Sequence, residues 1–283
     1  MALLRQRIEN SVVARSFGVE VALDRVRRFA RAAYGPYVST GQTMSLDDFI
    51  LRSLGDATTQ SLLQCLMFFA YGALHLHESD CVMPWLDLAP YCVLDYLAPD
   101  PHLIVPTRPF IPFDGTSRAE SALRRTNMLP LFFKRTRTDG GLGVSVAADA
   151  DYEAIPPDTA TRISGSSLKV RVNLLNYAPY ERQIQLRCRP NETVPARRLA
   201  RLVAAKVRDC IEKASQENVA IVNWENPNWK FGTGVDCYRV EHVLLLGVVF
   251  VSPGKVTPLL QVRPLPVPLT HPNNFVIDYG LLY

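Results

Sequence analysis

The stretch Leu168-Lys169-Val170-Arg171-Val172-Asn173-Leu174 alternates strictly between apolar and polar residues. Residues 183–188 alternate in the same way. Because successive side chains of a β-strand point to opposite faces of a sheet, this period of two predicts two strands, each with one buried face. Ala178-Pro179-Tyr180 lies between the two segments and predicts the turn that joins them.

A helix is expected after this strand pair. Pro195 suits the first position of a helix, and residues 196–214 have helical period. Two further strands are expected at 238–251 and 256–262, joined by Ser252-Pro253-Gly254. The order strand, strand, helix, strand, strand (ββαββ) resembles a β-grasp, the ubiquitin-like arrangement. That resemblance implies a mixed sheet with one packed helix, and it implies no function, since unrelated functions share such folds.

The N-terminal part of the chain reads as helical. Apolar residues recur at three and four over residues 3–34, with a break at Gly18 and an end at Gly35-Pro36. Ser45 is expected to cap a short helix that stops near residue 55. The apolar stretch 57–77 predicts a longer helix, and 86–97 predicts a further helical or mixed segment.

Five prolines between residues 99 and 112 exclude a regular helix there and indicate an extended segment. Within it, 117–127 is expected to form a short helix, 129–134 a strand and 147–161 an exposed loop. The predicted fold class is therefore α+β, in three regions. These are a helical region (1–97), a Pro-rich extended connecting segment (98–165) and an α+β region (166–283).

Composition places the chain among globular proteins, because 48% of its residues are hydrophobic and 20% are charged. The first residues lack the apolar run of a secretory signal, and no apolar run reaches the roughly 20 residues that a bilayer requires. The six cysteines are scattered, and none forms a Cys-x-x-Cys pair. We therefore expect an intracellular protein, cytoplasmic or in the virion if it is viral, with no membrane partner.

Positive charge is concentrated on the helix after Pro195. Residues 166–218 hold 11 Lys/Arg and 5 Asp/Glu, an excess of 6, whereas the net charge of the whole chain is +4. At 100° per residue, Arg197, Arg201 and Arg208 lie within about 40° of one another, with Arg198 further round. This face is a candidate site for an anionic partner, such as phosphate or a carboxylate-rich protein surface. The alternative is a solvated helix face with local pairs to Asp209 or Glu212.

Trp224 and Trp229 lie beside Lys230 and Phe231 in a loop rich in Trp and Asn. Such aromatic residues stack on nucleic-acid bases or anchor a protein interface. The alternative is that the rings fold back over the sheet, because indoles usually bury most of their area.

Neither a metal site nor a cofactor is expected. His75, His77, Cys81 and Cys92 carry donor atoms, but the cysteines lack the short paired spacing of structural zinc sites. A Gly-x-Ser-x-Gly or His-Glu-x-x-His motif is also absent from the sequence.

The leading hypothesis is a non-enzymatic structural or assembly protein of a larger complex, for example a viral capsid-associated subunit, whose partners are other protein subunits in a homo- or hetero-oligomer. The first alternative is an RNA-binding protein that uses the basic helix face, with Trp224 or Trp229 stacked on a base. The second alternative is an enzyme whose site is assembled from separated residues, with His75, His77 and Glu78 as first candidates.

Overall fold

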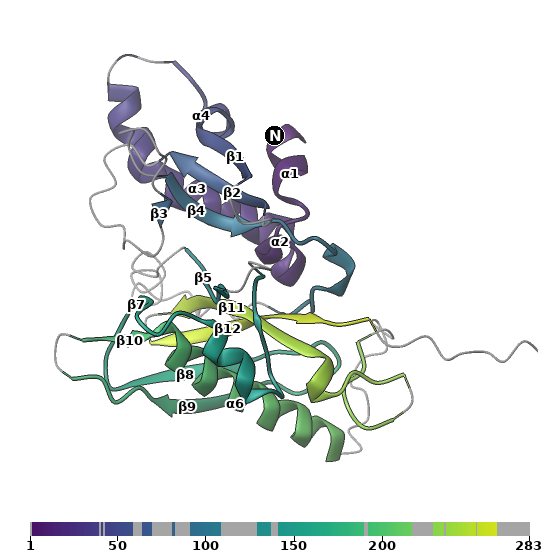
Figure 1. The fold of residues 1–283 in the computed structure, drawn as a ribbon. Helices are drawn as coiled ribbons and strands as arrows, with labels where there is room; N and C mark the ends of the chain where they lie inside the picture. The colour runs from purple at the N-terminus through teal and green to yellow at the C-terminus, as the bar shows by residue number, and fades with distance from the viewer. Residues whose placement is uncertain are drawn as a thin grey trace, which may run out of the picture.

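The structure is a computed structural model and describes most of the chain (Figure 1). The described residues are 2–39, 41, 43–58, 64–69, 81–82, 91–108, 129–136, 141–189, 192–216, 229–234, 236–252 and 254–264. Helices and a mixed multi-strand sheet occur together, which confirms the α+β class. No helix in these ranges is both long and apolar enough to cross a lipid bilayer.

The predicted order of strand, strand, helix, strand, strand is present at the C-terminal side. It consists of β8 (Ser167–Val172), β9 (Tyr180–Gln185), α6 (Ala196–Gln216), β11 (Val243–Ser252) and β12 (Lys255–Val262). The sheet runs β5-β11-β12-β8-β9, and β6 also pairs with β11. Strands β8 and β12 are parallel at its centre, while the other pairs are antiparallel. The short strands β5 and β6 span Leu131–Phe132 and Val144–Ser145.

Alternation in β8 has the predicted consequence for burial. Leu168, Val170 and Val172 are buried, whereas Lys169 is exposed. The buried side chains share one hydrophobic core with the apolar face of α6, which is built from Leu199, Ala200, Val203, Ala204, Val207, Cys210 and Ile211. Burial of this apolar area is what holds the helix against the sheet.

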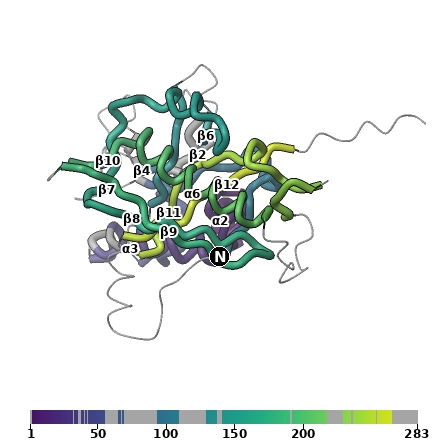
Figure 2. The backbone as a smooth tube through the Cα atoms, turned by 90° about the horizontal axis from the view of Figure 1, so that it is seen from below, coloured from purple at the N-terminus to yellow at the C-terminus, as the bar shows by residue number. Residues whose placement is uncertain are grey.

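The hairpin β11–β12 contributes to two cores. Leu245 and Val248 belong to the core under α6, whereas Leu246 and Val249 belong to the core formed with the N-terminal helices. The central sheet is therefore covered on both faces. In Figure 2, seen from below, the N-terminal helices lie behind the strands and α6 lies in front of them.

A close approach of the β5 and β11 backbones requires glycine at one position of β11. A Cβ atom on Gly247 would lie 2.3 Å from the carbonyl oxygen of Leu131 in β5. No side chain fits at that distance, so only glycine permits β5 to pair with β11 at this point.

The N-terminal helices are α1 (Ala2–Ile8), α2 (Val12–Phe17), α3 (Val19–Ser39) and α4 (Leu46–Ser53). The expected break at Gly18 is present, with φ at 93°. The expected cap at Ser45 is also present, since its side chain accepts a hydrogen bond from the amide of Asp48. The predicted end at Gly35-Pro36 was wrong, because α3 continues to Ser39. Gly35 keeps a negative φ, and a proline in the last turn interrupts only the bonds of that turn.

The predicted helix over 57–77 was also wrong. The described part of that stretch forms the strands β1 (Leu54–Thr58) and β2 (Gln64–Phe69). Together with β3 (Cys81–Val82) and β4 (Tyr91–Tyr96) they make a second sheet in the order β1-β2-β4-β3. A short apolar run is compatible with a buried strand as well as a buried helix, so its period did not decide between them.

The Pro-rich connecting segment is extended only in part where it is described, because Pro101–Leu103 form the 3₁₀ helix η2. The residues after η2 pair within the chain. Bridges join Ile104 to Gln261 of β12 and Thr107 to Leu174, just after β8. The expected strand near residue 131 is present, whereas the expected helix at 117–127 lies outside the described residues. The expectation of an exposed loop at 147–161 was wrong in part. That stretch contains η3 (Asp149–Ala154), with Tyr152 and Ile155 fully buried, and the start of β7 (Ala160–Ser164), which pairs with β10 (Thr193–Pro195).

Candidate partner-binding surfaces

The predicted anion-binding residues lie on α6, which begins directly after β10. The amide of Ala196 donates a hydrogen bond to the carbonyl of Thr159 (2.8 Å), so the start of the helix is fixed to the segment before β7. We call Arg197, Arg201 and Arg208 the arginine face. The structure brings all three side chains against one segment, residues 146–155, which includes η3.

Arg197 makes the largest number of these contacts. Its Nη1 donates to Oε2 of Glu153 (2.5 Å), and its Nε and Nη2 donate to the carbonyl of Ile155 (2.9 and 2.6 Å). Nη2 also reaches the carbonyl of Glu153 (3.0 Å). Only 23% of the Arg197 side chain is exposed. Its donor groups are therefore mostly used inside the protein.

Arg201 and Arg208 also form hydrogen bonds and ion pairs with the segment that contains η3. Arg201 pairs with the other carboxylate oxygen of Glu153 (3.0 Å), and its guanidinium lies 5.6 Å from the centre of the Tyr152 ring. Arg208 donates from Nη2 to the carbonyl of Val146 (2.7 Å) and lies 3.7 Å from a carboxylate oxygen of Asp149. These partners differ from Asp209 and Glu212, the local partners that the sequence suggested. Asp209 instead pairs with Lys206 (2.6 Å).

Arg198 lies apart from the arginine face, as its position on the helical wheel predicted. It is partly exposed, and it has no hydrogen bond or ion pair with any residue that the structure describes. Of the four predicted arginines it is the one whose charge has no carboxylate partner within the described ranges.

The two predicted tryptophans have different outcomes. Trp224 lies outside the described residues. Trp229 is partly buried against the core under α6, and its ring stacks on that of Tyr238 with centroids 5.9 Å apart. Its carbonyl accepts a hydrogen bond from Asn176 (3.3 Å). This is the arrangement of a ring folded back over the sheet.

A second group of charges was missed by the sequence reasoning. The carboxylate of Glu181 in β9 lies 2.7 Å from Lys255, 3.6 Å from Lys169 and 3.7 Å from Arg171. The hydrogen bond from Lys255 and the three nearby cations lower the pKa of Glu181. The carboxylate of Glu181 thus contacts three cations of two neighbouring strands. The signal was present in the alternation of 168–174, whose polar positions must share one face.

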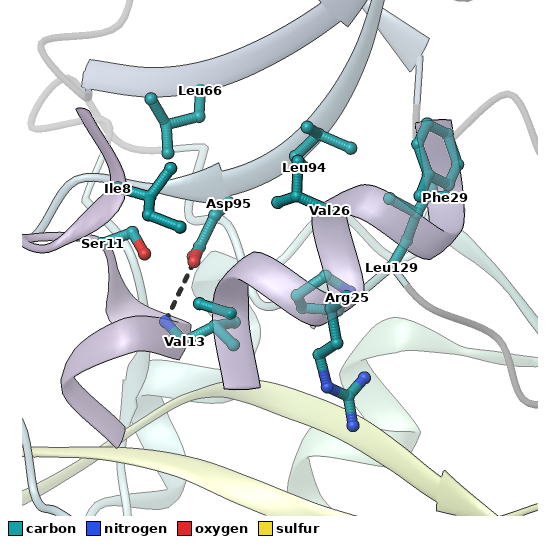
Figure 3. Close-up of a pocket in the computed structure, with 12 residues that line it drawn as sticks. Ile8, Ser11, Val13, Arg25, Val26, Phe29, Leu66, Leu94, Asp95 and Leu129 are labelled. Atoms are coloured by element: carbon teal, nitrogen blue, oxygen red, sulfur yellow. Dashed lines mark hydrogen bonds between the residues drawn. The ribbon is translucent and has the colours of Figure 1, made fainter. Parts of the chain in front are cut away.

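A buried carboxyl group was missed as well. Asp95 of β4 is 4% exposed and accepts hydrogen bonds from the amides of Val13 (3.0 Å) and Tyr96 (2.8 Å) (Figure 3). Burial raises the pKa of Asp95 to about 7, although these hydrogen bonds, a further one from Ser11 and the charge of Arg25 act in the opposite direction. Figure 3 shows the guanidinium of Arg25 turned away from Asp95 and toward the central sheet. There it donates to the carbonyl of Phe250 (2.9 Å).

The surroundings of Asp95 are too small for a ligand. The cavity beside it has a volume of about 20 Å³ and is otherwise lined mainly by apolar side chains of α2, α3 and the second sheet. That volume holds roughly one water molecule. We interpret Asp95 as a structural group that joins β4 to the first turn of α2.

A larger cavity of about 190 Å³ lies between β4, β5 and the start of α6. Its wall includes Tyr96, Phe132 and Ala196, and the ammonium of Lys134 lies 5.4 Å from the centre of the Tyr96 ring. The lining is mainly apolar, and the amide of Ala196 already has its partner in Thr159.

The donor atoms considered for a metal are only partly described. His75 and His77 lie outside the described residues, as does Glu78. The register places Cys81 of β3 directly opposite Cys92 of β4, which the spacing in sequence did not reveal. Among the described residues, no group of three or more His, Cys, Asp or Glu side chains is arranged to hold a metal ion.

Comparison with known proteins adds no relative. No family model matches this sequence, and searches of curated proteins and of solved structures return no significant match.

Proposed function

We propose that the chain is a non-enzymatic structural or assembly protein of a larger complex, and that its partners are other protein subunits. A capsid-associated subunit of a virus is one such role, and an intracellular location, cytoplasmic or in the virion, belongs to the same proposal. The observation that carries it is the concentration of positive charge on the paired strands β8 and β9 and their flanks. Residues 166–189 hold five Lys/Arg and one Glu, an excess of four positive charges on two paired strands and their flanks.

The arginine face favours a protein partner over RNA. A phosphate backbone is bound by cations that are free to release their counterions. Arg197, Arg201 and Arg208 instead share the carboxylates of Glu153 and Asp149. Their guanidinium groups orient the segment that contains η3, so replacing them is expected to disturb the fold before it disturbs a partner.

The test is size-exclusion chromatography with light scattering on the full chain, before and after nuclease treatment and at two salt concentrations. An oligomer whose mass is unchanged by nuclease supports the proposal. A monomer at every concentration, with no co-purifying protein and no bound nucleic acid, contradicts it.

RNA binding is the second candidate, and Arg198 is the observation that favours it. Arg198 has no carboxylate partner among the described residues, and the side chain of Arg201 is 52% exposed. If the helix binds phosphate, the affinity for single-stranded RNA must fall steeply with salt and weaken when Arg198 is replaced by Ala. Unchanged RNA affinity of Arg198→Ala contradicts this use of the helix.

A further inference from the structure

Strand β9 ends the six-stranded sheet. It pairs with β8 on one side, and no described strand pairs with its other side (Figure 1). An unpaired edge presents a row of backbone amides and carbonyls, which is a template for adding a further strand. The charged side chains Glu181 and Arg182 are a common protection of such an edge against non-specific pairing.

The direction of the backbone groups follows from two hydrogen bonds. The amide of Leu186 donates to the carbonyl of Ser166 (2.8 Å), and the amide of Lys169 donates to the carbonyl of Gly254 (2.9 Å), away from β9. In an antiparallel pair the residues alternate between bonding inward and outward. Arg182 and Ile184 therefore bond to β8, while Glu181, Gln183 and Gln185 direct their amides and carbonyls outward. The outward carbonyl of Glu181 accepts a hydrogen bond from Nη1 of Arg182 (2.9 Å).

The charged side chains near this edge favour an added strand with acidic side chains. Lys169, Arg171 and Lys255 lie on the sheet face next to β9, each within 3.7 Å of the carboxylate of Glu181. Arg182 is exposed, and the side chain of Arg189 is 86% exposed and lies 3.9 Å from the carboxylate of Glu192. An acidic segment gains favourable electrostatic contacts with these groups, whereas a basic segment is repelled.

We propose that β9 binds an extended, acidic segment of a partner protein by strand addition, through the outward backbone groups of Gln183 and Gln185 and the outward amide of Glu181. This proposal rests on the proposed function and names the kind of contact by which the chain joins a partner. The backbone hydrogen bonds provide affinity, and the cations beside the edge provide the preference for acidic side chains.

The experiment compares Gln183→Pro with Gln183→Ala in the full chain. Proline removes the outward amide of residue 183 without removing a bond to β8, and prolines are tolerated on the edge of a sheet. Alanine keeps that amide. The probe is a fluorescein-labelled nine-residue peptide that alternates Glu with Val and Thr, titrated by anisotropy. A peptide with Lys in place of Glu is the charge control.

We expect the wild-type chain and Gln183→Ala to bind the acidic peptide equally, and Gln183→Pro to bind it about tenfold more weakly. Arg182→Glu is expected to weaken binding by reversing a charge beside the edge, and it also removes the hydrogen bond that Nη1 of Arg182 donates to the carbonyl of Glu181 (2.9 Å). Circular dichroism and thermal melting establish that each variant is folded. If Gln183→Pro fails to fold, Gln185→Pro makes the same test at the next outward amide.

Three outcomes overturn the proposal. The first is no binding of the acidic peptide by the wild-type chain, and the second is equal binding by Gln183→Pro and Gln183→Ala. The third is preferential binding of a 12-nucleotide single-stranded RNA that displaces the peptide and is insensitive to Gln183→Pro, which favours nucleic acid. These three outcomes overturn only the strand addition, whereas a wild-type chain that is a monomer without partners overturns the proposed function.

Discussion

Arg197 of α6 and Glu153 of η3 form an ion pair with 2.5 Å between Nη1 and Oε2, across 44 positions of the sequence. The same guanidinium also donates to the carbonyls of Glu153 and Ile155. Because those carbonyls lie where η3 ends, the arginine gives the end of η3 its hydrogen-bond partners.

Replacing Arg197 by Ala is therefore expected to lower the free energy of unfolding by about 1–3 kcal/mol, since it leaves partly buried carbonyls without donors. Urea denaturation followed by circular dichroism measures this change. Arg198→Ala on the neighbouring face is the control and should change stability by less than about 0.5 kcal/mol. Equal effects of the two substitutions contradict a structural role for Arg197.

Asp95 is expected to make stability depend on pH near neutrality. Its pKa in the folded protein is raised to about 7 by burial, so the folded state holds a proton there that the unfolded state has already lost. The stabilising contribution is complete in acid and is lost as the pH rises toward 7. The free energy of unfolding should be lower at pH 8 than at pH 5, by roughly 2 kcal/mol.

Asp95→Asn is the matched variant for this test, because it removes the titrating group and keeps the shape. Urea denaturation at the two pH values should show a clearly smaller difference for Asp95→Asn than for the wild type. A wild-type chain that is more stable at pH 8 than at pH 5 would show the sign to be wrong.

Gly247→Ala is expected to destabilise the protein strongly. The added Cβ would lie 2.3 Å from the carbonyl oxygen of Leu131, so β5 must move away from β11. We expect a loss of about 3 kcal/mol or more, measured by thermal or urea denaturation. Gly35→Ala in α3 is the control, since its Cβ meets no atom within 4 Å outside the neighbouring residues. The helix preference of alanine and the restriction imposed by the following Pro36 act in opposite directions, so that control should change stability by less than about 1 kcal/mol.

Two buried threonines are expected to respond oppositely to valine. Thr257 is fully buried, and its hydroxyl has no hydrogen-bond partner among the residues that the structure describes, so Thr257→Val should leave stability unchanged or raise it by about 1 kcal/mol. The hydroxyl of Thr161 donates to the carbonyl of Val194 (2.7 Å) and accepts from the amide of Ile163. Thr161→Val should cost about 1–3 kcal/mol. Similar effects at both positions would show that the hydroxyl of Thr257 has a partner in solution.

The elements that sequence reasoning found are those that depend on neighbouring residues. The alternation at 168–174, the helix after Pro195, the break at Gly18 and the cap at Ser45 all follow from periods or hydrogen bonds that span a few positions. The helix expected over 57–77 shows the opposite case. Its apolar residues are compatible with a helix and with a strand. The segment forms a strand because β2 pairs with β1 and β4.

The same distinction between local and long-range contacts applies to the candidate sites. The helical wheel placed Arg197, Arg201 and Arg208 together and set Arg198 apart, because the pitch of a helix is a local property. It did not indicate that Glu153 and Asp149 would form ion pairs with all three arginines of that face. The cluster around Glu181 and the burial of Asp95 likewise depend on strands that meet only in the folded chain.

By itself, then, the sequence determined the ββαββ order, the amphipathic face of α6 and the concentration of positive charge in its C-terminal part. These follow from residue spacing and composition. Only the tertiary structure decided which arginines form ion pairs with carboxylates and which strand lies at the edge of the sheet. It also decided which backbone amides and carbonyls of β9 point away from β8. Those properties are set by contacts between segments tens of residues apart, and no local period encodes them.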